Sequence, residues 1–321
     1  MKNKFALIFY TLWMFSSSQA EAAKAPIEIQ TFVYMLDLRE IDGARQNFSA
    51  DVFVRLRWKD PMLESSEGAR VLPINTAWNP GIQIVNRITV QTTLPEVLEV
   101  DKDGNVIYRQ RFIGQFSSLL DLREFPFDRQ TLSISMAAPG KSPEEVRFVQ
   151  DPERGGLGNK ITITDWEIGE WRAGEQPYQT TPRGRSIAGF VFEMDTTRRV
   201  QYFLVQILLP MTLILGMSWI VFWLDYSQTG PRISISITSM LTLVAYRLLT
   251  GSFLPRLSYL TRLDYFVFGC TTLVFLSLLT VVWISRLLLA KKEAIAIRVD
   301  AGSRWFFPLL FLLMLTFSLW L

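Results

Sequence analysis

Residues 230–252 read GPRISISITSMLTLVAYRLLTGS, and the organisation of the whole chain depends on this stretch. It is apolar, and it has the length of about 20 residues that a helix needs to cross a bilayer. It is also the most hydroxyl-rich of the hydrophobic segments. Steps of four, three, four and three place a stripe of residues on one helix face. The stripe consists of Ser234, Thr238, Leu241, Ala245 and Leu248.

The stripe passes from small and hydroxylated at one end to apolar at the other. A single membrane helix gains nothing from such a pattern, whereas a ring of identical helices would enclose a water-filled lumen with a polar end and an apolar waist. Alternatively, the Ser and Thr side chains are small residues at contacts between packed helices. This segment alone leaves both interpretations open.

The composition excludes several classes of function. The chain has 321 residues, a net charge of +3, no histidine and one cysteine. Without histidine there is no Ser-His-Asp or Cys-His catalytic set, and no zinc site built on His or Cys is expected. Lys and Arg are scattered, so we expect no nucleic-acid partner. We expect no enzyme, no metal and no cofactor, although acidic residues alone could serve a glycosidase.

The amino-terminal residues 1–23 have the pattern of a secretory signal peptide. Lys2 and Lys4 precede an apolar run over 5–15, and a stretch containing Ala20, Ala22 and Ala23 follows. The apolar run is too short for a fifth membrane helix. We therefore expect the rest of the first half of the chain to lie outside the cytoplasm.

Residues 24–198 predict a domain of short strands. Apolar and polar residues alternate repeatedly, and clusters of Gly, Pro, Asn and Asp separate the alternating segments, a pattern typical of a β-sandwich. Asp103-Gly104 is a favourable hairpin turn. The predicted strands include residues 27–29, 53–58, 106–112, 132–136, 161–166 and 188–194.

Residues 199–321 predict a membrane domain. Four apolar stretches have about the length of a bilayer crossing: 201–224, 231–252, 262–287 and 304–321. The predicted loop 288–303 is short and basic, which places it in the cytoplasm by the positive-inside rule. Pro210 interrupts the first stretch, so a neighbouring group is needed for the carbonyl that it leaves free.

The order of these segments and several motifs resemble the pentameric ligand-gated ion channels, the Cys-loop receptor family. Residues 121–128, DLREFPFD, are similar to the family's F/Y-P-F-D loop, and Trp78-Asn79-Pro80 is similar to its W-x-P stretch. Arg198 before the first membrane stretch and the loop 254–259, LPRLSY, also fit. The cysteine pair and the long cytoplasmic insert of eukaryotic members are absent, which favours the prokaryotic branch.

The resemblance implies an immunoglobulin-like, all-β extracellular sandwich followed by a four-helix transmembrane bundle, in a homopentamer around a central pore. The stripe would then line the pore, with Leu241 as an apolar ring. A bacterial inner membrane is the implied location, with the amino-terminal domain in the periplasm. The implied partners are other copies of the chain, membrane lipid, permeant monovalent ions and a small-molecule agonist. A membrane-anchored sensor that does not conduct is the competing interpretation.

Two residues before the stripe compete to set ion selectivity. Asp225 is the only acid in the inner loop, whereas Arg232 follows a proline as in anion-conducting members. Rings of charged side chains sort ions by sign. We expect a cation channel, with an anion channel as the alternative. Arg232 would have no such role if it turned away from the lumen.

The agonist site is expected between adjacent extracellular domains. Alternation puts Phe53, Arg55 and Arg57 on one strand face and Arg109 with Arg111 on another, and converging arginines suit a carboxylate ligand. Alternatively, these arginines form a solvated strand face that pairs with acids across the interface. Gating by pH would need shifted acids, since the chain has no histidine. The remaining candidates, by position in the family, are Arg87, Tyr178 and Phe190.

Coupling between the two domains is expected at their junction, where the family places acids beside the arginine that precedes the first helix. Breaking such a buried cluster by removing one partner is costly. The cluster could also simply hold the two domains together. The predicted coupling residues are Asp42, Phe125, Pro126, Asp128, Arg198 and Pro255.

Overall fold

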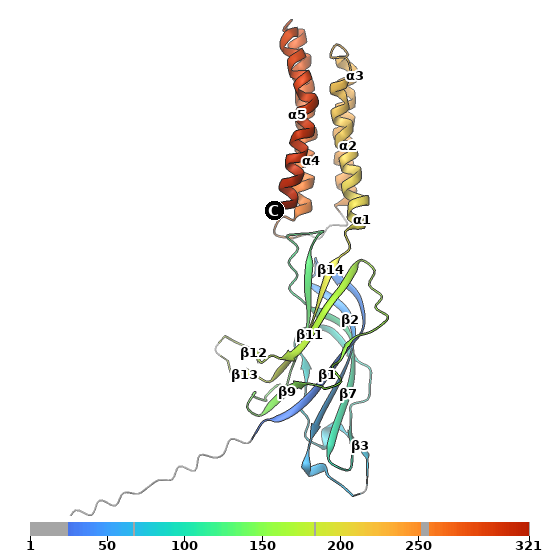
Figure 1. Cartoon of the computed structure of the whole chain (residues 1–321), viewed down its shortest axis with the longest axis vertical. Coiled ribbons are helices and arrows are strands. Elements are labelled where there is room, and N and C mark those ends of the chain that lie inside the picture. The colour runs from blue at the N-terminus through green and yellow to red at the C-terminus, as the bar shows by residue number, and fades with distance from the viewer. Residues whose placement is uncertain (1–24, 67, 183, 252–256, 321) are drawn as a thin grey trace, which may run out of the picture.

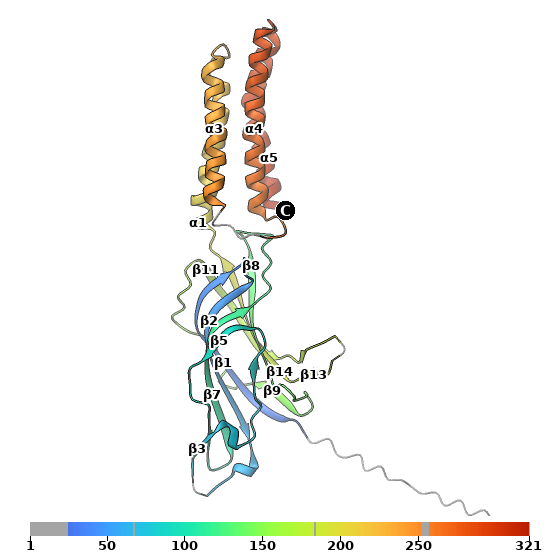
Figure 2. The same cartoon turned by 180° about the vertical axis from the view of Figure 1, so that it is seen from behind.

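The computed structural model describes residues 25–66, 68–182, 184–251 and 257–320. A strand-rich domain continues lengthwise into four long helices (Figure 1). The two connections α2–α3 and α4–α5 lie at the end of the helices away from the strands, and the carboxyl terminus lies beside the strand domain (Figure 2). We call these the inner and the outer end. The expected signal peptide and Pro255 lie outside the described residues.

The strand domain is a sandwich of two sheets, as the alternating pattern predicts. One sheet has the order β10-β1-β2-β7-β6-β3, with β5 on β7 and β9 on β1, and the other has the order β11-β14-β8-β4. Strands β12 and β13 form a separate hairpin. The strands are β1 (Ile27–Asp42), β2 (Asn47–Lys59), β3 (Arg70–Pro73), β4 (Gln83–Ile84), β5 (Arg87–Thr92), β6 (Val97–Val100), β7 (Asn105–Ser117), β8 (Arg129–Ala137), β9 (Val146–Gln150), β10 (Gly156–Leu157), β11 (Trp166–Glu175), β12 (Tyr178–Gln179), β13 (Ser186–Ile187) and β14 (Gly189–Arg198).

The core of the sandwich comes from residues that alternate along the strands. Val52, Val54 and Leu56 of β2 face inward, and Phe190 and Phe192 of β14 face them from the other sheet. Every second residue is buried because successive side chains of a strand point to opposite faces. The same period decides which residues remain at the surface.

One predicted strand differs from the structure. Residues 161–165 are extended but belong to no sheet, and β11 begins at Trp166. The Thr162 hydroxyl and backbone N–H both donate to the Asp37 carboxylate, and the Ile163 N–H donates to the Leu38 carbonyl at 3.0 Å, so these bonds hold the segment against β1 without a regular strand ladder. The predicted turn at Asp103-Gly104 does join β6 to β7, and Gly104 has φ of 74°.

Four helices are long and apolar enough to cross a membrane. The first crossing combines α1 (Gln201–Phe203), a π-helical turn (Leu204–Leu208), α2 (Leu209–Ile220) and a short 3-10 turn (Val221–Trp223). The Gln206 carbonyl, which Pro210 cannot satisfy, accepts a hydrogen bond from the Tyr246 hydroxyl of the next helix. The other three crossings are α3 (Thr229–Thr250), α4 (Arg262–Leu289) and α5 (Glu293–Trp320).

The last helix corrects the prediction of a loop over 288–303. Helix α5 begins at Glu293, so the inner connection is limited to residues 290–292. Its first turns are amphipathic, since Ala296, Asp300, Ser303 and Phe307 are buried at helical spacing. Of the basic residues in the predicted loop, Arg298 therefore lies on α5, whereas Lys291 and Lys292 lie in the short connection. The fold as a whole confirms the sandwich followed by a four-helix membrane domain.

Candidate functional site

The stripe on α3 faces away from the other helices of its own chain. All five stripe residues are exposed, and the side chains of Leu241 and Leu248 are 65% and 76% exposed. The opposite face, with Arg232, Ser236, Ser239 and Leu243, is buried. The hydroxyls of Ser236 and Ser239 donate to carbonyls one turn back, at 3.0 and 2.9 Å. Helix α3 thus has one uncharged face that no other helix covers in the part of the chain that the structure describes.

At the inner end, the two selectivity candidates lie in opposite environments. Arg232 is 1% exposed, and its Nε donates to the Val221 carbonyl at 2.8 Å. Its Nη2 pairs with the buried carboxylate of Asp300 on α5. Arg232 therefore lies inside its own subunit and not on the stripe, because the first crossing and α5 supply its partners.

Asp225 lies in the exposed connection between the first crossing and α3. The backbone N–H of Ser227 donates to its carboxylate at 2.9 Å. That bond, a further one from the Ser227 side chain, and the charge of Arg232 hold the pKa of Asp225 below the usual aspartate value. The carboxylate is exposed at the inner end of the helices, and its lowered pKa favours the ionised form.

Most of the predicted agonist-site arginines are already paired with acids of the same chain. Arg55 contacts Asp151 at 3.1 Å and Glu153 at 2.7 Å, and Arg111 donates to Asp51 at 2.9 Å. Arg109 pairs with Glu99. A carboxylate ligand would have to displace these partners. These ion pairs lie within one chain, whereas the alternative interpretation placed the acids across the interface, so that alternative stays a prediction.

The other agonist-site candidates do not converge. Phe190 is 1% exposed within the sandwich core, so it cannot line an open site. The Phe53 ring packs edge-on against Phe32, and Arg57 lies 3.9 Å from Glu153. Tyr178 is half-buried on the β12–β13 hairpin. Arg87 is exposed on β5 and has no ion pair among the described residues.

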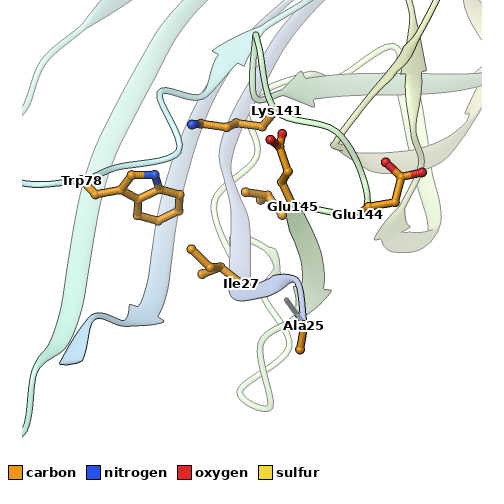
Figure 3. Close-up of a pocket in the computed structure, with 7 residues that line it drawn as sticks. Ala25, Ile27, Trp78, Lys141, Glu144 and Glu145 are labelled. Carbon is orange, nitrogen blue, oxygen red and sulfur yellow. The ribbon is translucent and has the colours of Figure 1, made fainter. Parts of the chain in front are cut away.

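A cavity of about 400 Å³ lies elsewhere in the strand domain, between the start of β1 and the loop before β9. Figure 3 shows Lys141 reaching over Trp78, with Glu144 and Glu145 on the same loop. The Lys141 ammonium is 6.0 Å from the centre of the Trp78 ring. None of the predicted agonist-site residues lines this cavity.

At the outer end, Arg198 and Asp128 meet as the sequence predicts. Arg198 Nε and Nη2 donate to the two Asp128 carboxylate oxygens at 2.7 and 3.1 Å, and Asp128 is 1% exposed. Gln130 donates to the same carboxylate at 2.9 Å. The guanidinium carbon lies 4.1 Å from the centre of the Trp166 ring and 4.8 Å from that of Phe125. This pair is fully enclosed.

The loop before β8 connects the Arg198–Asp128 pair to the membrane domain. Leu122 and Phe125 belong to the apolar core of the helices, and Phe125 packs edge-on against Phe203 at 4.9 Å between ring centres. Pro126 is buried between them and Asp128. The Leu122 N–H donates to the Tyr259 hydroxyl at 3.0 Å, and the Leu263 N–H donates to the Phe125 carbonyl at 3.2 Å.

Asp42 is also a predicted coupling residue, but its carboxylate does not take part in the Arg198–Asp128 pair. Its carboxylate accepts from the Arg45 N–H at 2.9 Å, within the β1–β2 turn. The turn reaches the junction through Gln46 instead, which exchanges two hydrogen bonds with the backbone of Leu120. A half-buried glutamine amide beside a turn carries no sequence signal for this role, so the sequence analysis missed it.

Comparison with known proteins identifies both domains. Residues 14–199 match the neurotransmitter-gated ion-channel ligand binding domain, and residues 207–294 match the neurotransmitter-gated ion-channel transmembrane region. The chain is 26% identical over 296 residues to a proton-gated ion channel of Gloeobacter violaceus, covering 91% of this chain and 82% of that one.

Two further relatives are subunits of gamma-aminobutyric acid receptors. Identity is 26% over 287 residues with subunit theta of Mus musculus, and 26% over 284 residues with subunit gamma-4 of Gallus gallus. The matches cover 82% and 83% of this chain but 42% and 60% of those subunits, so the chain spans less than two thirds of either. The two family matches together show that this multi-pass membrane protein belongs to the neurotransmitter-gated ion-channel family, and that it is a gated ion channel and not an enzyme.

Proposed function

We propose that five copies of the chain form a cation-selective channel whose pore is lined by the stripe on α3 and opened from the strand domain. One observation carries the proposal: every stripe residue is exposed in the single chain, while Arg232, Ser236, Ser239 and Leu243 on the opposite face of α3 are buried. A ring of copies would turn the exposed faces toward a common axis. Family membership supports the conducting reading over a sensor that does not conduct.

The stripe has the chemistry of a gated pore. Ser234 and Thr238 would form hydroxyl rings that replace part of an ion's hydration shell, and Leu241 would form an apolar ring that stops ions by dewetting. The Thr238 hydroxyl donates to the Ser234 carbonyl at 2.9 Å, which leaves its oxygen lone pairs free to accept from water or to contact a cation.

Cation selectivity is supported by the different positions of the two charges at the inner end. Arg232 is buried and paired, so it adds little field to the lumen. Asp225 is exposed and held ionised, so a ring of five would attract cations. Protons are the first stimulus to apply, because one relative is a proton-gated ion channel. Small carboxylates are the second, with exposed Arg87 as the unpaired candidate.

The lining is tested by cysteine accessibility. Ser234→Cys and Thr238→Cys should be blocked irreversibly by a charged thiol reagent, because these side chains face the lumen. Ser236→Cys and Ser239→Cys are matched controls on the buried face and should be insensitive. The native Cys270 is fully buried and should give little background. Equal block at all four positions would contradict the assignment.

Selectivity is tested by reversal potentials in asymmetric sodium chloride. A reversal potential that follows the sodium gradient supports the proposal, and one that follows the chloride gradient contradicts cation selectivity while keeping the channel. If no stimulus opens the protein, Leu241→Ser should supply the current, since a polar ring at the waist stays wet. No current from Leu241→Ser pentamers at the cell surface would contradict the pore itself.

A further inference from the structure

Three charged side chains form a cluster at the inner end of the helices, which we call the inner cluster: the buried Arg232 on α3 and Asp300 on α5, and the partly exposed Arg304 on α5. Asp300 is 2% exposed and binds both guanidinium groups, Arg232 through Oδ1 and Arg304 through Oδ2 at 3.2 Å. The two Nε atoms donate to the last carbonyls of the first crossing, Val221 and Phe222, both at 2.8 Å. One carboxylate thus serves two cations.

We propose that Asp300 is a positioning residue for ion selectivity, which holds Arg232 inside the subunit and so keeps a ring of positive charge out of the inner mouth of the pore. This inference rests on the proposed pore. It assigns a role in selectivity to a residue of the last helix that does not face the stripe.

The cluster explains why Arg232 stays buried. A buried arginine without an acidic partner is strongly unfavourable, because its desolvation is not compensated. Asp300 is the one carboxylate among the described residues that pairs with Arg232. The Val221 carbonyl and the Phe222 ring, 5.7 Å from the guanidinium carbon, are neutral, so neither would compensate the charge of Arg232 after Asp300 is neutralised.

An unpaired Arg232 has a short route to water. It is the fourth residue of α3, so one turn separates it from the exposed connection that carries Asp225. Pro231 is exposed, and the space beside Gly230 is open, since a Cβ placed there would meet nothing within 4 Å. Arginine can bury its stem and extend its charged group to water over such a distance. The inner mouth lies at that end of the stripe.

Arg304 is more exposed than Arg232 and supplies the control. Its side chain is 40% exposed, and its removal leaves the contact between Asp300 and Arg232 in place. The two arginines therefore separate the general effect of disturbing α5 from the specific effect of releasing Arg232.

The test compares reversal potentials in asymmetric sodium chloride. Asp300→Asn should lower the ratio of sodium to chloride permeability by about tenfold, because five released arginines face the permeant ions at close range. Arg304→Gln and Asp300→Glu should keep the wild-type ratio. Adding Arg232→Gln to Asp300→Asn should restore it. A purely structural role of Asp300 would change the number of channels at the surface but not the reversal potential. If disturbed packing alone shifted the reversal potential, adding Arg232→Gln would not reverse that shift.

Several outcomes would overturn the inference. An Asp300→Asn channel with the wild-type reversal potential is one, and a shift that persists in the double variant is another. If Asp300→Asn does not reach the surface, Arg232→Gln alone decides: the wild-type ratio is expected, and a clear rise in cation permeability would show that Arg232 already acts on the pore. A chloride-selective wild type would contradict the proposed function, but the difference between wild type and Asp300→Asn would still decide this inference.

Discussion

The helices of this channel have a buried arginine–aspartate pair at each end, and the two pairs differ in what surrounds them. At the outer end, Arg198 and Asp128 join the last strand to the loop that enters the membrane domain, with two bonds of 2.7 and 3.1 Å. At the inner end, Arg232 and Asp300 join α3 to α5. Each arginine also lies over aromatic rings.

The difference lies in the alternatives open to each charge. Trp166 and Phe125 enclose the Arg198 guanidinium, and the short Asp128 side chain has no route to solvent. The inner pair lies one helical turn from the exposed inner connection, and its aspartate is shared with Arg304. A broken outer pair must therefore leave a charge buried, whereas a broken inner pair can release its charge to water. Breaking the arginine–aspartate pair is therefore expected to cost more stability at the outer end than at the inner end.

The largest effect is expected at the outer pair. Arg198→Ala leaves the Asp128 carboxylate buried with one amide partner, Gln130, and should cost about 3–5 kcal/mol of stability. We expect few pentamers at the surface and a lowered thermal midpoint of the detergent-solubilised protein. Arg199→Ala is the matched control, because Arg199 is exposed and its contact with the Thr164 carbonyl is long, at 3.4 Å. Similar losses from both variants would contradict the role given to the buried pair.

The sequence predicted the outer pair but not the inner one, for a physical reason. Asp128 and Arg198 lie at fixed places next to recognisable strand and helix ends, so a family pattern brings them together. The partner of Arg232 depends on how α3 and α5 pack, which no local pattern encodes. One signal was available: Asp300 is an acid four residues before Arg304 at the start of an apolar stretch, and ionisable residues there are rarely idle.

In the strand domain, too, the sequence pattern predicts which face a residue occupies but not which residue it pairs with. The alternation that predicted the sandwich also places Phe190 and Phe192 on the same inward face, so period two alone argued against Phe190 as a ligand contact. The arginines of β2 and β7 were correctly placed on strand faces that are not part of the core. Their acid partners come from distant loops and strands, as with Asp151 for Arg55, and only the fold brings these together.

A smaller effect on stability is expected at the inner pair. Asp300→Asn keeps one acceptor oxygen where the carboxylate had two, and it lets Arg232 move toward water, so we expect a loss of about 1–3 kcal/mol. The thermal midpoint should fall less than in Arg198→Ala, measured on the same detergent-solubilised pentamers. A fall larger than that of Arg198→Ala would mean that the inner cluster is as enclosed as the outer pair, and it would remove the basis of the comparison.

The smallest effect is expected from acidifying the solution at the inner end. This experiment tests the exposed carboxylate of Asp225 and not the buried carboxylate of Asp300. Bonds from Ser227 hold the pKa of Asp225 below the usual aspartate value of about 3.9. A group with a lowered pKa keeps its charge until the pH falls below that usual value. The permeability ratio of sodium to chloride should therefore stay constant from about pH 8 to about pH 5 and decline only below about pH 4. Asp225→Asn should give the low ratio at every pH, since it removes the titrating charge. A decline between about pH 7 and about pH 5 that Asp225→Asn leaves in place would assign the filter to another group, and selectivity at the inner mouth would then not depend on separating an exposed acid from a buried arginine.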